Sequence, residues 1–277
     1  MKFGNECYTW FMKESGGYWD NQLAHMIEVT AKAGMSGIEP MHFWMGDLSN
    51  PDRLGDCLKE NGIDLAAIAL VLDWNNPEES EEEIQQAEQT INLLKRFPGA
   101  LLCTVQMPNG RHNLEQRRKN LVANVNTVSR RAVDAGVPCS FHPNSPESSI
   151  NRTEEDYSVI IDGLDSSVTG WTPDVGHIIN GKMDPLTKMK QYADLINHVH
   201  YKDWDGKPEF ALMGDGEVDF QGITQWLSDQ HYDGWIICED EAPQAVDDPD
   251  GVTLHDGKWI KDTLIPSITT NYNQKQC

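Results

Sequence analysis

Short apolar runs and longer amphipathic stretches alternate along the whole chain. Apolar or β-branched runs typical of buried strands recur eight times, at residues 2–10, 37–41, 64–70, 100–106, 138–144, 168–176, 196–203 and 234–241. Between them lie stretches in which apolar residues recur every three or four positions, a spacing typical of amphipathic helices. The pattern therefore predicts strands that alternate with helices from one end of the chain to the other.

The ends of the predicted helices carry local signals that support this assignment. Ser80 and Thr153 each precede an acidic first turn, in "SEEE" and "TEED", which favours helix initiation. The stretches "AKAG", "KENG" and "VDAG" each end in Gly directly before a predicted strand. Alternating strands and helices form parallel sheets. We predict one α/β domain over residues 1–277, a closed (β/α)8 TIM barrel, with an open doubly wound sheet as the alternative.

The placement of polar residues favours the barrel over the open sheet. An open doubly wound sheet usually carries its ligand-binding motif directly after the first strand, and no GxGxxG or Walker A loop occurs there. Ionisable residues occur instead near the carboxyl ends of several strands, where barrel enzymes build their active sites. We also expect an acidic loop at 242–257, either a lid over that site or a surface excursion, and a polar tail at 268–277.

Composition narrows the classes of partner. The chain has 44 acidic and 22 basic residues and a formal net charge of −22, so it repels nucleic acids and anionic membranes. Its six cysteines include no CxxC pair, which favours buried free thiols in a reducing compartment. The first residues lack the apolar core of a signal peptide, and no apolar run is long enough to span a bilayer. We expect a cytoplasmic protein, and leave open whether it forms a homo-oligomer.

Several strands place ionisable residues where a core would place Val or Ile. In "HVHYKD", residues 198, 200 and 202 share one face of a strand, because side chains alternate between the two faces. Burying such groups unpaired is costly, so we expect them to meet each other, a ligand or a metal. Two imidazoles and two carboxylates suit a divalent manganese, zinc, cobalt or iron ion better than calcium. The predicted metal ligands are His142, Asp174, His200 and Glu239.

Individual members of this set also have purely structural interpretations. His142 alone could be a hydrogen-bonded core histidine, and Asp174 could cap the turn that follows it. Glu39 could form a structural pair with Lys202 across the barrel, and His198 could make a core hydrogen bond. The functional hypothesis depends on the joint occurrence of the four ligands at the ends of four successive strands.

The chain resembles the xylose isomerase-like barrel superfamily, often labelled sugar phosphate isomerase/epimerase. The runs "HVHYKDWDGKPEFALMGDGEVDF" and "HYDGWIICEDE" are similar to its H-x-K-D … G-x-G-x-x-D-F … Y-x-G-W … E ending, and "GIEP" and "DVGH" agree with it. The resemblance covers nearly the whole chain and implies one divalent metal on the same four ligands. Manganese is the expected ion, with zinc, cobalt, iron or magnesium as alternatives.

The resemblance also assigns roles to further residues and departs from the family pattern at one position. It implies that His177 contacts the substrate and that Lys202 and Asp203 form the family's K-D pair. In the ketose 3-epimerase branch the strand-five ligand is a glutamate that also transfers a proton, whereas this chain has His142 there. A metal-bound histidine is a poor proton acceptor, which argues against a symmetric two-glutamate epimerisation.

These features predict a metal-dependent carbohydrate isomerase or epimerase that acts on a keto sugar or related polyol ketone through a metal-stabilised enediolate. The alternative is a keto-sugar lyase or dehydratase that works by β-elimination, similar to the inosose dehydratase and keto-glycoside-cleaving branches. Glu239 is the predicted base, and the other predicted catalytic residues are His177, Lys202 and Glu39. The predicted substrate-binding residues are His177, Lys202, Asp203, Asn144, Trp10 and Trp44.

Two hypotheses assign the chain to other functional classes, a nuclease and a binding protein. An abasic-site endonuclease shares this barrel but needs additional His and Glu ligands and a basic DNA-binding face, and this acidic sequence shows neither. A binding barrel without catalytic activity would keep the fold and lose the metal.

Overall fold

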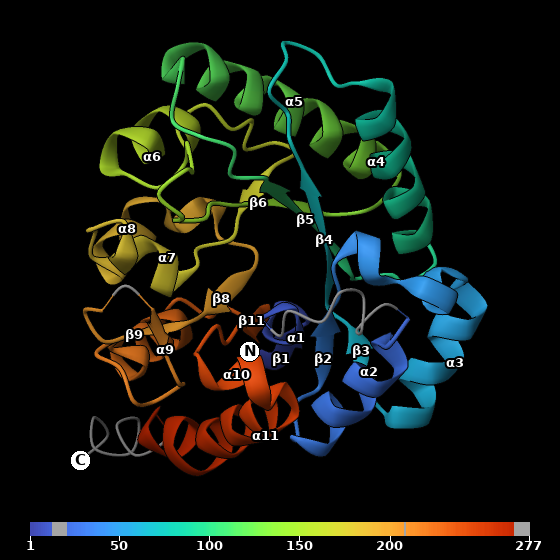
Figure 1. Ribbon diagram of the computed structural model, residues 1–277, viewed down its shortest axis with the longest axis vertical. Helices are drawn as coiled ribbons and strands as arrows, with labels where there is room; N and C mark the ends of the chain where they lie inside the picture. The colour runs from blue at the N-terminus through green and yellow to red at the C-terminus, as the bar shows by residue number, and fades with distance from the viewer. Residues whose placement is uncertain (13–20, 208, 269–277) are drawn as a thin grey trace.

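The computed structural model describes residues 1–12, 21–207 and 209–268. Parallel strands lie at its centre and helices surround them (Figure 1). The central strands are β1 (Lys2–Glu6), β2 (Gly37–Glu39), β3 (Asp64–Leu65), β4 (Ala67–Leu72), β5 (Leu101–Gln106), β6 (Cys139–His142), β7 (Gly170–Trp171), β8 (Val199–Tyr201) and β11 (Trp235–Cys238). A separate antiparallel pair consists of β9 (Asp203–Trp204) and β10 (Phe210–Ala211).

The central strands form two parallel sheets that meet along both edges. One sheet has the order β3-β2-β1-β11-β8, and the other has the order β4-β5-β6-β7. Met41 after β2 forms an isolated bridge with Ala69 on β4, and Asp174 after β7 forms one with His200 on β8. This parallel ring of strands inside a layer of helices is the α/β barrel predicted from the sequence.

Apart from the last one at Pro249–Trp259, which lies mainly in the predicted loop at 242–257, the outer helices occupy the predicted amphipathic stretches. They are α2 (Leu23–Lys32), α3 (Pro51–Asn61), α4 (Glu81–Leu94), α5 (Leu114–Asp134), α6 (Glu154–Ile160), α8 (Pro185–Gln191), α9 (Phe220–Asp229) and α11 (Pro249–Trp259), with shorter helices α1 (Tyr8–Phe11), α7 (Val175–Asn180) and α10 (Gln244–Asp247). Ser80 and Thr153 both form capping boxes, as their sequence context predicts. Gly62 ends α3 with φ of +69°, a left-handed conformation that favours glycine.

Alternation along β4 separates the core beneath the helices from the interior of the barrel. Ile68 and Leu70 are buried in the main hydrophobic core, whereas Ala67 belongs to a separate small cluster with Leu101 and Cys103. Successive side chains along a strand point alternately toward the helices and toward the interior of the barrel. Because Ile68 and Leu70 point toward the helices, Ala67 and Ala69 point to the interior. Small interior residues leave room for a cavity at the carboxyl end of the strands.

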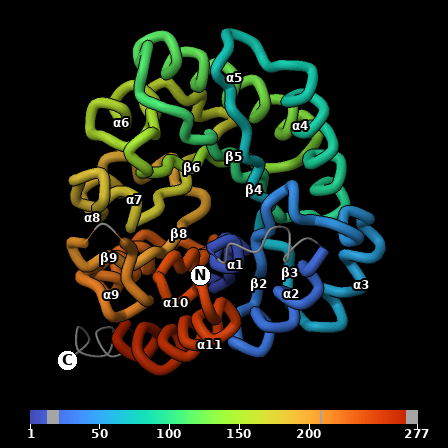
Figure 2. Tube along the Cα trace, viewed as in Figure 1, coloured from blue at the N-terminus to red at the C-terminus, as the bar shows by residue number. Residues whose placement is uncertain are grey.

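The structure differs from the predicted elements at both ends of the chain. The first strand ends at Glu6 instead of residue 10, and α1 follows it. The predicted acidic loop at 242–257 is largely helical, because Asp248 accepts a hydrogen bond from Gly251 N at 3.0 Å and Pro249 begins α11. Helix α11 packs beside α2, so a helix from the first part of the chain lies next to one from its last part (Figure 2).

Two further expectations concern the tail and the membrane. Most of the predicted polar tail at 268–277 lies outside the described residues, which end at 268. Across the described parts of the chain, we find no helix with both the length and the apolar character needed to cross a membrane.

Candidate active site

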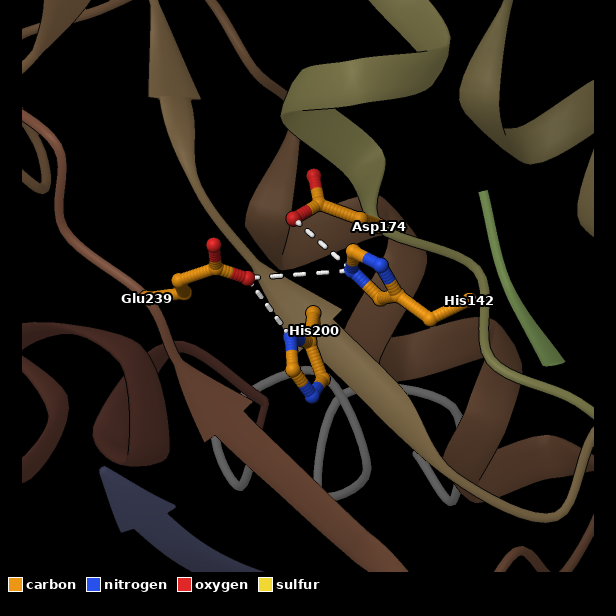
Figure 3. Close-up of side chains that lie close together, drawn as sticks. All are labelled: His142, Asp174, His200 and Glu239. Carbon is orange, nitrogen blue, oxygen red and sulfur yellow. Dashed lines mark hydrogen bonds and ion pairs between the residues drawn. The ribbon is translucent and has the colours of Figure 1, made fainter. Parts of the chain in front are cut away.

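Four side chains from successive strands of the barrel point toward one another at its carboxyl end (Figure 3). Each offers one nitrogen or oxygen atom, and these atoms all lie within 4.8 Å of one another. Nδ1 of His200 lies 2.8 Å from Oε2 of Glu239. Nε2 of His142 lies 3.6 Å from Oδ2 of Asp174 and 3.7 Å from Oε2 of Glu239. The structure therefore brings together all four residues that the sequence suggested as ligands.

The atoms left without partners in this cluster fit a divalent cation. Among the described residues, neither ring nitrogen of His142 has a hydrogen-bond partner, and Oδ2 of Asp174 has none either. A buried polar atom without a partner costs about 1–3 kcal/mol, and a cation bound between these atoms would remove that cost. Two imidazoles and two carboxylates are donors that zinc, manganese, cobalt and iron accept. The residues that could hold a metal are His142, Asp174, His200 and Glu239.

The turn that carries Asp174 lets one carboxylate serve two purposes. Its Oδ1 accepts a hydrogen bond from the backbone N–H of His177 at 2.8 Å and caps α7, as the structural interpretation of the sequence suggested. This cap leaves Oδ2 directed toward His142. Burial alone would raise the pKa of Asp174, but the Lys202 ammonium and His177 hold it well below its usual value. Asp174 is therefore an ionised, oriented donor.

A buried carboxylate beneath the cluster fixes the ring of His200. Oε2 of Glu39 lies 3.1 Å from Nε2 of His200 and 2.6 Å from Nε2 of His198. Burial favours a neutral Glu39, but the two imidazoles hold its pKa well below the usual range. With Nε2 held by Glu39, Nδ1 of His200 faces Glu239. Carboxylates that hold the second nitrogen of a ligand histidine set its tautomer and orientation, so Glu39 is placed to position His200 and not to pair with Lys202.

Lys202 supplies a buried positive charge among three carboxylates. Its Nζ lies 2.8 Å from Oε1 of Glu239 and 3.4 Å from Oδ2 of Asp174, and it also contacts Glu241. Burial would lower the pKa of Lys202, but Asp174 and Glu239 raise it well above its usual value. The side chain is therefore an ammonium that offsets the negative charge of the site.

The same lysine determines which ring nitrogen of His177 carries the proton. Nζ of Lys202 lies 3.0 Å from Nε2 of His177, and an ammonium can only donate, so Nε2 accepts. Burial and the adjacent Lys202 lower the pKa of His177 to about 3, so the ring is neutral and Nδ1 carries the proton. Nδ1 then donates to Oγ of Ser145 at 2.8 Å, and Asn180 donates to the same oxygen at 2.9 Å. This arrangement leaves the hydroxyl hydrogen of Ser145 free for a ligand.

Two further carboxyl groups line the pocket. Burial raises the pKa of Glu241 to about 7, although Lys202 opposes the rise and Glu239 adds to it. Burial and the nearby Glu239 and Glu39 also raise the pKa of Glu6 well above its usual value. Glu241 is partly exposed to the pocket and therefore able to exchange a proton there.

The cavity above the cluster holds about 310 Å³ and has two unlike walls. One wall carries polar side chains from β6, α7, β8 and the end of β11, and the other carries apolar side chains from the ends of β2, β4 and β5. The polar lining residues of the first wall are His142, Asn144, Ser145, His177, Asn180, His200, Glu239 and Glu241.

Besides Lys202, which is fully buried, three of the predicted substrate-binding residues do not line this cavity. Trp10 is fully buried and donates from Nε1 to Asp250 at 2.7 Å. Trp44 is half-buried and packs against Phe11, with ring centroids 5.3 Å apart. The carboxylate of Asp203 accepts backbone hydrogen bonds from Gly214 and Gly216, both at 2.9 Å, and so holds its own loop. These contacts are structural, because none of the three side chains reaches the cavity surface.

Asn144 does lie on the cavity wall. Its Nδ2 donates to the backbone oxygen of Gln106 at 2.8 Å, whereas its Oδ1 is buried without a partner among the described residues. That oxygen can accept a hydrogen bond from a hydroxyl group of a ligand.

Sequence reasoning missed several lining residues. Glu6 is the last residue of β1, and Glu241 follows the ligand Glu239 by two positions, so the alternation of side chains along a strand could have indicated both. Ser145 and Asn180 lie outside the strands and carry no comparable signal. Phe11 and Phe43 line the cavity where Trp10 and Trp44 were expected to do so.

Comparisons with known proteins agree with this fold. Residues 27–263 match the family described as xylose isomerase-like TIM barrel. An inosose dehydratase from Clostridium botulinum is 25% identical in an alignment of 175 residues that covers 56% of this chain and 57% of that protein. One from Bacillus velezensis is 27% identical in an alignment of 172 residues that covers 56% of this chain and 57% of that protein. The chain thus spans about half the length of the curated relatives it matches.

Solved structures with low sequence identity share the fold over nearly the full chain. The IOLI protein with a bound zinc atom has a TM-score of 0.77 and 17% identity, covering 98% of this chain and 99% of that one. D-psicose 3-epimerase with D-tagatose from Clostridium cellulolyticum H10 has a TM-score of 0.77 and 14% identity, covering 97% of this chain and 99% of that one. The dehydratases and the epimerase are enzymes, in agreement with the predicted class. The predicted fold and resemblance are confirmed: the chain belongs to the xylose isomerase-like TIM barrel family.

Proposed function

We propose that this protein is a divalent-metal-dependent lyase that removes the proton beside the carbonyl group of a keto sugar and expels a group from the next carbon. The four-ligand cluster would hold the ion through His142, Asp174, His200 and Glu239. When bound, a divalent ion polarises a carbonyl oxygen and so acidifies the neighbouring C–H bond. We expect manganese, as the sequence suggested.

The observation that carries the choice of reaction is the one-sided placement of proton-transfer groups. Glu239, Glu241, Lys202 and His177 come from β8, β11 and α7. The carboxyl groups of Glu6 and Glu39 also line the cavity, but they lie on β1 and β2, next to β11 in the barrel. On the opposite side the described lining residues of β4 and β5 are apolar, and His142 on β6 is assigned to the metal. Epimerisation returns the proton to the opposite face of the same carbon and needs a second acid there. A syn elimination, in which the proton and the leaving group depart from the same face, needs proton transfer on one side only.

The residues of the polar wall have distinct roles in this reaction. Glu239 is the candidate base, as predicted from the sequence, and Glu241 is the candidate acid that protonates the leaving group. Ser145 donates its free hydroxyl hydrogen to a substrate oxygen, and Oδ1 of Asn144 accepts from a substrate hydroxyl. Lys202 holds both glutamates in place through its ammonium group.

An isomerase that acts on the same keto sugars is the second candidate. The proton of an aldose–ketose isomerisation also moves along one face, so the same one-sided set of residues could serve it. The inosose dehydratases among the relatives favour elimination. Epimerisation, part of the prediction from the sequence, is the least supported of the three outcomes.

Product analysis in deuterated water tests the proposal. The manganese-loaded protein is incubated with a panel of cyclic and open-chain keto sugars, and products are followed by mass spectrometry and ultraviolet absorbance. An unsaturated ketone lighter by the leaving group supports the lyase, whereas an isomer carrying deuterium supports the isomerase. Glu241→Gln should reduce turnover by about 100-fold or more, and Glu60→Gln, an exposed glutamate on α3, should not. Recovery of unchanged, undeuterated sugars throughout would contradict the proposal.

A further inference from the structure

The apolar wall of the cavity is made by one continuous part of the chain. Between residues 41 and 108, every described residue that lines the cavity is apolar. These side chains extend from the ends of β2, β4 and β5 to the mouth of the barrel. They are Met41, Phe43, Ala69, Val71, Val105, Met107 and Pro108.

Large apolar side chains at the mouth of this wall are exposed to solvent. Phe11, Phe43 and Met107 are 45%, 46% and 44% exposed. The rings of Phe11 and Phe43 meet edge to face, with centroids 6.5 Å apart at 70°. Exposed apolar groups gathered at one concave place are typical of binding surfaces. Because Phe11 and Phe43 belong to different elements, the fold itself brings them together.

A bare sugar does not match this wall. A polyol presents hydroxyl groups on most of its carbons, and a hydroxyl held against Val71, Val105 or Met107 would lose its hydrogen bonds to water without replacement. The polar wall already offers the donors and acceptors that a sugar ring needs. The division of the cavity therefore calls for a ligand with one polar and one apolar end.

We propose that the substrate is a keto sugar that carries an aromatic substituent, such as an aryl aglycone, and that this substituent binds against Val71, Met107 and the two phenylalanine rings. The inference rests on the proposed function, because that function places the keto sugar at the metal cluster. Edge-to-face aromatic contacts and the adaptable thioether of Met107 favour a flat ring over an alkyl chain. The wall then acts as a specificity determinant for the group attached to the sugar.

Binding of two unreactive glycosides tests this independently of catalysis. Methyl β-D-glucoside and phenyl β-D-glucoside have the same sugar and no carbonyl, so neither enters the proposed reaction. Isothermal titration calorimetry of each is performed on the manganese-loaded and the metal-free protein. We expect the phenyl glucoside to bind at least about tenfold more tightly, and the preference to persist without metal because it arises at the opposite wall.

Substitutions on the wall provide the matched comparison. Val71→Thr keeps the shape and adds a hydroxyl, and Met107→Gln keeps the length of a partly exposed chain. Each should reduce the preference for the phenyl glucoside several-fold, and Val159→Thr, at an exposed site on α6, should leave it unchanged. Equal affinities for the two glycosides, or no binding of the phenyl glucoside, overturns the inference.

The test separates this inference from the proposed function. If keto sugars are converted but the aryl preference is absent, the wall only contacts the C–H face of the sugar and the inference fails alone. If the aryl preference is present but no keto sugar is converted, the proposed reaction fails while the binding role of the wall stands.

Discussion

Two groups of barrel strands carry different side chains toward the same cavity. One group is β4 and β5, whose cavity-lining side chains are apolar, and the other is β6, β8 and β11, whose cavity-lining side chains are polar. All are parallel and buried, and all direct their carboxyl ends to one cavity. Near their carboxyl ends, the first two place Val71 and Val105 in the cavity lining, whereas the others place His142, His200 and Glu239 there. The fold therefore determines where a side chain lies, and the residue at each strand end determines what the site does there.

The two halves also differ in what stabilises them. Apolar side chains need only close packing. The ionised groups of the polar half each depend on another group: Asp174 on the N-terminus of α7 and on Lys202, and Glu39 on two histidines. Loss of one partner leaves a buried charge uncompensated. Substitutions in the polar half should therefore propagate, and substitutions in the apolar half should stay local.

The largest effect is expected for Glu239→Gln. The substitution removes a charged donor from the metal cluster and also a partner of Lys202 and His200. We expect loss of stoichiometric metal and a fall in kcat/KM of about 1000-fold or more. Metal content by mass spectrometry of the purified protein and steady-state kinetics measure the two effects.

Val71→Thr is the control from the other half. Val71 is the last residue but one of β4, and Glu239 directly follows β11. Val71 offers no ligand atom to the cluster, so metal content should be unchanged. Equal metal loss in both variants would show that the cluster is not what holds the ion.

Stability should be most sensitive at Asp156, a buried carboxylate behind the polar half. It accepts from Arg111 at 2.7 Å and from the Thr153 N–H at 2.8 Å, and it pairs with Arg118, so it fixes the segment between β6 and α6. Asp156→Asn should lower the free energy of unfolding by about 3 kcal/mol, measured by urea denaturation. Asp52→Asn, which breaks an exposed pair with Arg96, should cost less than about 1 kcal/mol.

The effect at Asp156 should depend on pH with a defined sign. Burial favours the neutral form, but the hydrogen bond from Arg111 and the capping bonds at Thr153 give a pKa below the usual value. A carboxyl whose pKa is lower in the folded state stabilises the protein fully above its unfolded pKa of about 4. This contribution is lost as the pH falls through the lowered value. The difference between Asp156→Asn and the unsubstituted protein should shrink in that range, and a difference that grows instead would contradict the assignment.

The polar half was more predictable from the sequence than the apolar half, for a physical reason. A charged residue inside an apolar strand must have a partner, so Asp174, His200 and Glu239 can be recognised from the sequence as candidate site residues. The alternation of side chains along a strand then places them inside the barrel. An apolar residue at a strand end gives no such signal, since most apolar residues belong to the core. The apolar wall therefore became visible only in three dimensions.

The aromatic residues show how a small local change misleads sequence reasoning. Residues 2–10 were predicted as one strand, but the chain turns into α1 at Tyr8, where Oε2 of Glu6 accepts from its N–H at 2.5 Å. Side chains in a helix advance around the axis instead of alternating. Phe11 therefore faces the cavity and Trp10 faces the core.

A smaller effect is expected for Glu39→Gln, at the boundary between the two halves. Glutamine has the same shape but lacks the charge that holds His198 and His200. Loss of such a supporting carboxylate should weaken metal affinity by about 10–100-fold, measured by competition with a chelating dye. Glu83→Gln alters a buried glutamate that accepts from the backbone of Trp74 and Ser80, away from the cluster, and should leave metal affinity unchanged. Equal losses in the two variants would assign Glu39 to general stability.

The smallest effect is expected for Met107→Gln, which places a polar group on the apolar wall. Because Met107 is 44% exposed, the free energy of unfolding should change by no more than about 0.5 kcal/mol. The side chain is remote from the groups that transfer protons, so it contributes equally to binding of substrate and transition state. Loss of such uniform binding raises KM and leaves kcat unchanged, and we expect an increase in KM of about three- to tenfold for a substrate with an apolar substituent. A fall in kcat at constant KM would mean that the apolar half takes part in the chemical step, and the functional division between the two halves of the barrel would then be wrong.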